Sequence, residues 1–248
     1  MLPHYSPYKV VEQFSLLANL YPDRIDLGIG RAPGSDMTTA SALARTGRPF
    51  FHDFPQQVEQ LSNFLWNPDA RPLVSPQPPR DLPIWMLGSS ADSAVLAAER
   101  GLPYNLGAFI NPTVDPSLIH HYKSAFQASA LQTSPHAILT ISVFCADTEE
   151  QARQHQRTFD VNFYRFITGR ANGGFLPPEQ ALAEPIDEGL QMFMDQRDLL
   201  RAVGDPDQVK AKIDMLASSF KADEMMFVSN MYHFEDRKRC FALLSEMA

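Results

Sequence analysis

The sequence contains little cysteine and no surplus of basic residues. Only Cys145 and Cys240 occur in 248 residues, and a chain of this length needs no disulfide to hold a core. We therefore expect two buried free thiols and a reducing, cytoplasmic location. The formal net charge of −8 argues against nucleic acid as a partner. The one compact basic run, residues 237–239, is flanked by Glu235 and Asp236 and predicts a solvated helix surface.

Long apolar runs and familiar metal motifs are also absent. The longest apolar run, Ala137–Ala146, is far shorter than the roughly 18 residues that a membrane span requires. The first five residues contain no basic region followed by an apolar one, so no signal peptide is expected. No CxxC, HExxH, GxSxG or GxxxxGK(S/T) motif occurs. The sequence therefore predicts no metal site and no membrane partner.

What the chain does contain is an alternation of helices and strands. Ser6-Pro7 predicts the start of a first helix, since serine caps and proline favours the first helical position. Five apolar strands are then predicted, each followed by a helix: Ile25–Ile29, Pro83–Gly88, Tyr104–Phe109, Ile138–Cys145 and Met225–Met231. Such alternation indicates an α/β fold with a parallel sheet, either doubly wound or closed as a barrel.

Two stretches are predicted to lack regular structure: the small, polar segment 32–46 and the Gly- and Pro-bearing segment 171–195. Gly204-Asp205-Pro206 is predicted to end one helix and begin the next. We expect one domain over residues 1–248, with a variable insertion within about 146–224, between the fourth and fifth predicted strands.

The first candidate site follows the first predicted strand. Parallel α/β folds bind their ligands at the carboxyl ends of strands. Gly28 and Gly30 would let the backbone approach a ligand closely, and Arg31 would follow the strand end. The structural alternative is a Gly-rich turn in which Arg31 pairs with Asp36 or with a helix end.

The second candidate site follows the second predicted strand, at Gly88-Ser89-Ser90-Ala91-Asp92-Ser93. Free backbone N–H groups, the positive end of the helix dipole and the hydroxyls of Ser89, Ser90 and Ser93 together predict an anion site. The alternative is plain N-capping, in which an acidic residue near the helix start is also favourable. Capping needs only one such residue, however, and three hydroxyls exceed that need.

These motifs resemble the bacterial-luciferase-like flavin monooxygenases, and within that family the LLM-class oxidoreductases. The residues that carry the resemblance are Leu2-Pro3-His4-Tyr5-Ser6-Pro7-Tyr8-Lys9-Val10, Glu12-Gln13-Phe14, the stretch from Tyr21 to Gly34, Trp85-Met86-Leu87-Gly88-Ser89-Ser90, Ala97-Ala98-Glu99-Arg100-Gly101-Leu102-Pro103-Tyr104, Gly204-Asp205-Pro206 and Ala222-Asp223-Glu224-Met225. The similarity runs nearly from end to end.

The resemblance implies a TIM-type (β/α)8 barrel that binds reduced FMN non-covalently and activates O2 for oxidation of a small organic substrate. It implies that Arg31, Gly88, Ser89, Ser90 and Ser93 bind the FMN phosphate; a deazaflavin remains an alternative cofactor. A separate flavin reductase and a second copy of the chain, forming a homodimer, are the expected partners. The stretch 171–195 corresponds to the family's variable insertion, a candidate lid. Luciferase has a reactive cysteine where this chain has Gly30, so no catalytic thiol is expected there.

The number of predicted strands departs from the family pattern. A (β/α)8 barrel takes about 250 residues before insertions, and the five predicted strands match the family's fourth to eighth. We therefore expect an N-terminally incomplete barrel in which Met1-Leu2-Pro3 aligns with the end of the third strand. No catalytic residue is identified, because the family's histidine-bearing segment precedes this point. Two alternatives stay open: a non-catalytic flavin-binding or dimerisation partner, and an unrelated phosphate-binding barrel.

Overall fold

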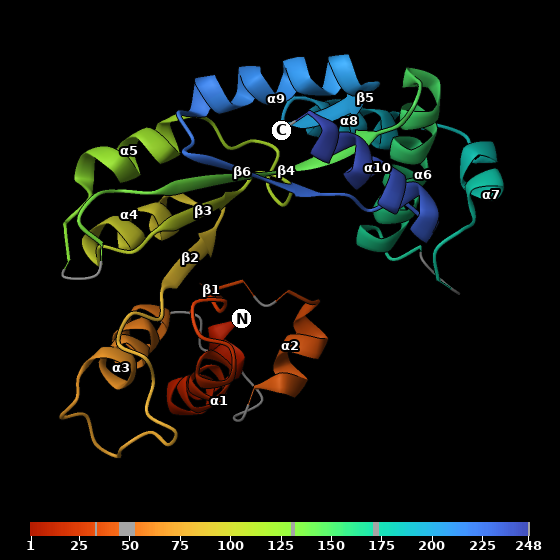
Figure 1. Cartoon of the computed structure of the whole chain (residues 1–248). Helices are drawn as coiled ribbons and strands as arrows, with labels where there is room; N and C mark the ends of the chain where they lie inside the picture. The colour runs from red at the N-terminus through yellow and green to blue at the C-terminus, as the bar shows by residue number, and fades with distance from the viewer. Residues whose placement is uncertain (33, 45–52, 130–131, 171–173, 248) are drawn as a thin grey trace. The chain divides into compact units, whose positions relative to one another are not determined.

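The computed structural model describes residues 1–32, 34–44, 53–129, 132–170 and 174–247. The chain forms two compact units (Figure 1). Unit 1 comprises residues 1–105 and 121–137, and unit 2 comprises residues 106–120 and 138–248. The prediction of a single domain over 1–248 with an insertion within about 146–224 stays a prediction.

Unit 1 combines a helical pair with the strand order β1-β2-β3. Its elements are η1 (Leu2–His4), α1 (Pro7–Leu20), β1 (Leu27–Gly30), α2 (Met37–Leu43), α3 (Phe54–Trp66), β2 (Ile84–Gly88), α4 (Ala91–Glu99), the start of β3 (Tyr104–Gly107) and the end of α5 (Ser117–Ala125). Helix α1 packs on α3, where the rings of Tyr8 and Phe64 meet edge to face at 5.4 Å. The buried apolar faces include Val10 and Val11 of α1 and Val58, Leu61 and Leu65 of α3.

Strands β1 and β2 are parallel and end almost level. Their register runs from Leu27 opposite Ile84 to Gly30 opposite Leu87. A Cβ on Gly30 would come within 3.2 Å of the Leu87 carbonyl oxygen, so glycine permits the close approach of the two strand ends. Arg31 therefore leaves β1 beside the point where Gly88 ends β2.

Unit 2 is built around β4 (Ala137–Cys145), all of whose residues are buried. β4 pairs in parallel with β5 (Arg201–Gly204) and with β6 (Glu224–Val228). The helices are α6 (Glu149–Ile167), α7 (Pro178–Ala183), α8 (Glu188–Asp198), α9 (Pro206–Phe220) and α10 (Phe234–Glu246). Helix α6 lies beside α7, α8 and β5, while α9 covers β5 and β6 (Figure 1). Continuous burial of β4 explains its unbroken apolar sequence.

All five predicted strands are present, with ends shifted by up to three residues. A sixth, β5, was missed: Gly204 ends this strand, so the prediction that Gly204 ends a helix is wrong. Asp205 and Pro206 do begin α9, and Asp205 forms a capping box with Gln208. The count of five strands is corrected to six among the described residues, and the parallel α/β class is confirmed.

Two stretches predicted to be irregular contain helices instead. In 32–46, Asp36 caps α2 by accepting hydrogen bonds from the backbone of Thr38 and Thr39. In 171–195, α7 and the start of α8 are helical, and the Asp187 carboxylate caps α8. Residues 33, 45, 46 and 171–173 of these predictions lie outside the described residues.

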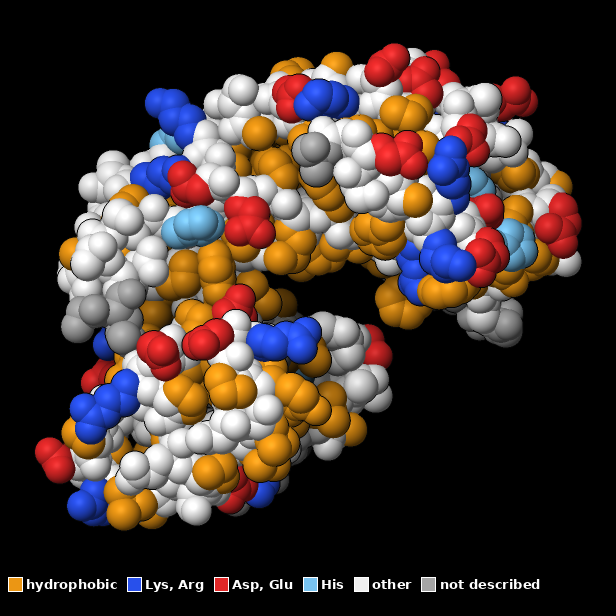
Figure 2. All heavy atoms as spheres, in the orientation of Figure 1, with side chains coloured by type: hydrophobic (Ala, Val, Ile, Leu, Met, Phe, Trp, Pro, Cys, Tyr) orange, Lys and Arg blue, Asp and Glu red, His pale blue; other side chains and the backbone are white. Residues whose placement is uncertain are grey.

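The two cysteines are free and buried, as predicted. The backbone N–H of Cys145 lies 3.5 Å from the sulfur of Cys240, which comes from α10. Residues 237–239 lie on exposed turns of α10, as predicted. Figure 2 shows acidic and basic side chains interspersed over the visible face. Within the described residues, no helix combines the length and apolarity needed to cross a bilayer.

Candidate anion site at the ends of β1 and β2

The candidate site lies wholly in unit 1, where β1 and β2 end. Arg31 Nη1 donates to Asp92 Oδ2 at 3.0 Å, and Asp92 stands in the first turn of α4. The structure thus brings the two predicted segments together. The alternative pairing of Arg31 with Asp36 is wrong, because Asp36 caps α2. The other alternative, pairing with a helix end, is what the structure contains.

The serines of the second segment are largely engaged with one another. Ser90 is the N-cap of α4 and forms a reciprocal capping box with Ser93. Ser93 Oγ accepts from the Ser90 backbone N–H at 3.3 Å and donates to the Ser90 carbonyl oxygen at 2.7 Å. Two of the three hydroxyls therefore stabilise the helix start, so capping requires more of this serine cluster than the sequence suggested. Half-buried Ser89 directly precedes the cap.

Gly88 is needed because Ser93 lies directly against it. A Cβ on Gly88 would come within 2.2 Å of Ser93 Oγ and 2.4 Å of Ser93 Cβ. Real Cβ atoms do not approach other atoms so closely, so any larger residue would displace the start of α4. Gly88 thus sets the position of the capping box relative to the end of β2.

Tyr104 of β3, which no sequence motif identified as a site residue, supports the capping box. Its side chain is fully buried, and its hydroxyl lies 3.2 Å from Ser93 Oγ and donates to the Gly88 carbonyl oxygen at 3.5 Å. Burial raises the pKa of Tyr104 to about 12, although the hydrogen bond with Ser93 lowers it in part. The sequence offered one signal, a tyrosine at the first position of a buried strand, since a buried hydroxyl requires a partner.

Replacing Tyr104 by phenylalanine is expected to reduce the loss of stability at alkaline pH. The folded pKa of about 12 lies above the ordinary value of 10, so the unfolded chain loses this proton first. The stabilisation is complete below pH 10 and falls as the pH rises toward 12, by about 2–3 kcal/mol in total. Urea unfolding at pH 9, 10 and 11 measures it for both proteins. An equal decline in both would contradict the assignment.

The electrostatics at the end of β2 suit an anion that can displace one carboxylate. Helix geometry leaves first-turn N–H groups without intrahelical acceptors, and the dipole places partial positive charge there. The Arg31 side chain is 45% exposed and that of Asp92 is 74% exposed, so their ion pair is screened and weak. An incoming phosphate group would compete with Asp92 for the same guanidinium at little cost.

Comparison with known proteins decides the family. The model of the luciferase-like monooxygenase family matches residues 1–221. The chain belongs to this family. It is 36% identical to the Bacillus subtilis protein YwcH over 99% of the chain and 76% of that protein. It is 33% identical to an Escherichia coli luciferase-like monooxygenase, over 100% of the chain and 74% of that protein.

Solved structures support the same assignment. The crystal structure of apo-MsnO8 superposes with a TM-score of 0.89 at 34% identity, covering 100% of this chain and 75% of that one. The luciferase-like fold, with a barrel that is incomplete over these residues, fits the six-stranded sheet.

Two remoter structures show the fold alone. One is the oxygenating constituent of 3,6-diketocamphane monooxygenase from Pseudomonas putida in complex with FMN, with TM-score 0.60, 18% identity and coverage of 99% and 76%. The other is a coenzyme F420-dependent reductase from Methanopyrus kandleri, with TM-score 0.66, 15% identity and coverage of 98% and 79%.

Proposed function

We propose that the chain is a flavin-dependent monooxygenase that uses reduced FMN and O2 on a small organic substrate, with the flavin reduced by a separate enzyme. The observation that carries this proposal is the meeting of Arg31 with the first turn of α4 at the ends of two parallel strands. Membership of the luciferase-like monooxygenase family supports the class of reaction. One structure of the same fold holds FMN and another depends on coenzyme F420, so FMN is the cofactor proposed and a deazaflavin is the alternative.

The residues present fit the phosphate of FMN. Gly30 and Gly88 keep Cβ atoms away from the two strand ends, and a Cβ at either position would meet the Leu87 carbonyl or Ser93. In this proposal the donors to the phosphate would be the Arg31 guanidinium, the hydroxyl of Ser89 and N–H groups in the first turn of α4. A guanidinium forms charge-assisted, often paired, hydrogen bonds with phosphate oxygens. This donor set suits a phosphate at the surface of unit 1.

Each residue has a separate task in this proposal. Arg31 would turn from Asp92 to the phosphate and hold it. Ser90 and Ser93 would keep the helix start rigid, and the hydrogen bond with the Tyr104 hydroxyl would hold the Ser93 side chain in place. The bound flavin supplies the activation of O2, and the protein supplies binding and orientation. No residue of this chain is assigned a proton-transfer step.

Replacing Arg31 by glutamine is expected to weaken FMN binding by about 10- to 100-fold, the usual worth of a hydrogen bond to a charged group. Titration of the purified chain with FMN, followed by the quenching of flavin fluorescence, measures the affinity. Riboflavin lacks the phosphate, so its affinity is expected to be equal in the Arg31→Gln variant and the unaltered chain.

Conversely, Asp92→Asn is expected to strengthen FMN binding several-fold, because it removes the carboxylate that competes with the phosphate for Arg31.

Arg100→Gln is the matched control. Arg100 stands in the same unit, is 38% exposed and pairs with the single carboxylate of Glu59 at 3.1 Å. FMN affinity equal in the Arg31 and Arg100 variants would overturn the phosphate site. Tight FMN binding without oxygen uptake after photoreduction would favour the non-catalytic partner instead. Preference for a deazaflavin over FMN would replace the cofactor while keeping the site.

A further inference from the structure

A cavity of about 550 Å³ in unit 2 is a further candidate site, separate from the anion site of unit 1. That volume is typical of pockets that enclose small organic molecules. Its walls are mainly apolar and are formed by Ile110, Phe159, Phe163, Phe175, Met231 and Tyr232. Two arginines, Arg197 and Arg237, also line it, and no acidic residue stands among its described lining residues.

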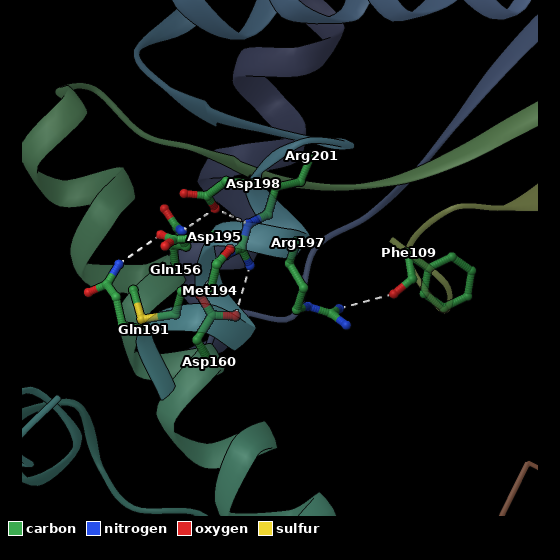
Figure 3. Close-up of polar contacts among 9 residues, drawn as sticks. All are labelled: Phe109, Gln156, Asp160, Gln191, Met194, Asp195, Arg197, Asp198 and Arg201. Carbon is green, nitrogen blue, oxygen red and sulfur yellow. Dashed lines mark hydrogen bonds and ion pairs between the residues drawn. The ribbon is translucent and has the colours of Figure 1, made fainter. Parts of the chain in front are cut away.

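Arg197, near the end of α8, is the unusual member of this lining. The residue is only 7% exposed, and its Nη2 donates to the Phe109 carbonyl oxygen at 3.0 Å. Its Nε is buried and lacks a hydrogen-bond partner among the described residues. Figure 3 shows its guanidinium directed toward Phe109 and away from the acidic residues of the cluster. A buried guanidinium that hydrogen-bonds only to a neutral carbonyl lacks a counter-ion.

The neighbouring carboxylates are already committed to Arg201. Asp160 accepts from both Nη atoms of Arg201, at 2.8 and 2.7 Å, and Asp198 accepts from its Nε at 2.6 Å. Burial lowers the pKa of Arg197, and the charge of Arg201 lowers it further, while the charge of Asp160 offsets a part. Both carboxylates therefore hydrogen-bond to Arg201, and neither hydrogen-bonds to Arg197.

Three phenyl rings surround the guanidinium of Arg197. Its Cζ lies 5.1, 5.3 and 5.9 Å from the ring centroids of Phe163, Phe193 and Phe159. Rings at such distances stabilise a cation but leave its in-plane N–H donors free to point elsewhere. A ligand that reaches Arg197 would thus contact phenyl faces along its body and a guanidinium at its end.

The other buried polar groups of the lining have their partners within the protein. Asn162 donates from Nδ2 to the carbonyl oxygens of Thr158 and Leu176, and its Oδ1 accepts from the Leu176 N–H. Thr158 donates to the Gln154 carbonyl oxygen. Among these buried groups, Arg197 alone retains unused hydrogen-bonding capacity within the described residues.

We infer that this cavity binds a small organic anion, with a carboxylate or sulfonate group at Arg197 and an apolar or aromatic body against Phe159 and Phe163. The anion would form an ion pair with Arg197, whose guanidinium has none among the described residues, and Arg237, on the exposed side of the lining, would favour its entry. As a binding site, the cavity is independent of flavin. As the substrate site of a monooxygenase, it rests on the proposed function.

Calorimetric titration of the full chain, without flavin and in buffer without phosphate, tests the inference. The probes are phenylbutanoate, phenylbutanesulfonate, phenylbutanol and phenylbutylamine, which share one apolar body and differ in the end group. We expect both anions to bind at least about tenfold more tightly than the alcohol, and the amine to bind most weakly. Equal affinities for anion and alcohol in the unaltered chain would overturn the inference, and this comparison requires no variant.

Arg197→Met retains an unbranched apolar side chain and removes the charge. We expect it to reduce the preference for anions over the alcohol to within about twofold, while Arg197→Lys keeps part of it. Arg153→Gln is the control, because Arg153 is an exposed arginine of α6 that pairs with Glu149 and does not line the cavity. An anion preference that survives in Arg197→Met would also overturn the inference. FMN titration of the same samples reports separately on the proposed function.

Discussion

Replacing Asp160 by asparagine is expected to lower the free energy of unfolding by about 3–5 kcal/mol. This is the usual cost of removing one partner of a buried ion pair and leaving the other charge, here Arg201, without it. The side chain of Asp160 is fully buried and that of Arg201 is 2% exposed. The two form a bidentate pair between α6 and β5 (Figure 3). Without the carboxylate, the Arg201 guanidinium keeps only Asp198 and a long hydrogen bond to the Met194 carbonyl oxygen.

Asp198→Asn is the matched control, because it changes the second carboxylate on the same arginine. Its side chain is 42% exposed, so water replaces what is lost, and we expect a cost of about 1 kcal/mol or less. The double variant Asp160→Leu/Arg201→Met is expected to recover most of the stability, because it removes both charges together. Urea unfolding followed by circular dichroism measures all four proteins. Equal losses of unfolding free energy in Asp160→Asn and Asp198→Asn would show that the buried carboxylate stabilises the fold no more than the exposed one.

This ion pair also explains why β5 could not be predicted. Arg201-Ala202-Val203-Gly204 is short and begins with a charge, which in a sequence favours a surface turn. Its buried position depends on Asp160, 41 residues earlier, and no local pattern connects the two. The predicted strands, in contrast, carry unbroken apolar runs, and β4 is buried along its whole length.

The helices in the supposedly irregular stretches were predictable in part. Asp36 and Asp187 are N-caps, the residue type that most favours a helix start, and each precedes a helix. The glycine, proline and small polar residues around these two caps are typical of irregular structure, and the prediction followed that composition instead of the caps. Gly189 lies close to Tyr164 of α6, so packing against α6 contributes stability that composition alone does not show.

The sequence predicts where the two segments of the candidate anion site lie, but not which partners their side chains have. Strand ends followed by Gly30-Arg31 and by Gly88-Ser89 suffice to place both segments at one edge of a parallel sheet. The partner of Arg31 was not predictable, because Asp36 is near in sequence while Asp92 is near in space. The dual use of Ser93, in the capping box and against Tyr104, likewise requires the folded chain.

Replacing Gly88 by alanine is expected to cost about 2–3 kcal/mol of unfolding free energy and to weaken FMN binding by about tenfold or more. The new methyl group would lie 2.2 Å from Ser93 Oγ and 2.4 Å from its Cβ. Rotation of the Ser93 side chain could move Oγ, but its Cβ is fixed to the backbone and cannot turn away, so the start of α4 must shift. The shift would move the helix N-terminus away from Arg31, and affinity for phosphate would fall with stability.

A double-variant cycle separates this clash from a general intolerance of alanine. Ser93→Gly removes both clashing atoms, so Gly88→Ala/Ser93→Gly is expected to cost at least about 1 kcal/mol less than the sum of the single variants. Gly107→Ala is the control at another strand end, where a Cβ would meet its nearest atoms at 3.4 Å, an ordinary contact. Strict additivity of the Gly88 and Ser93 variants would contradict the close approach. Non-additive stability with unchanged FMN affinity would confine the role of Gly88 to folding and place the phosphate elsewhere.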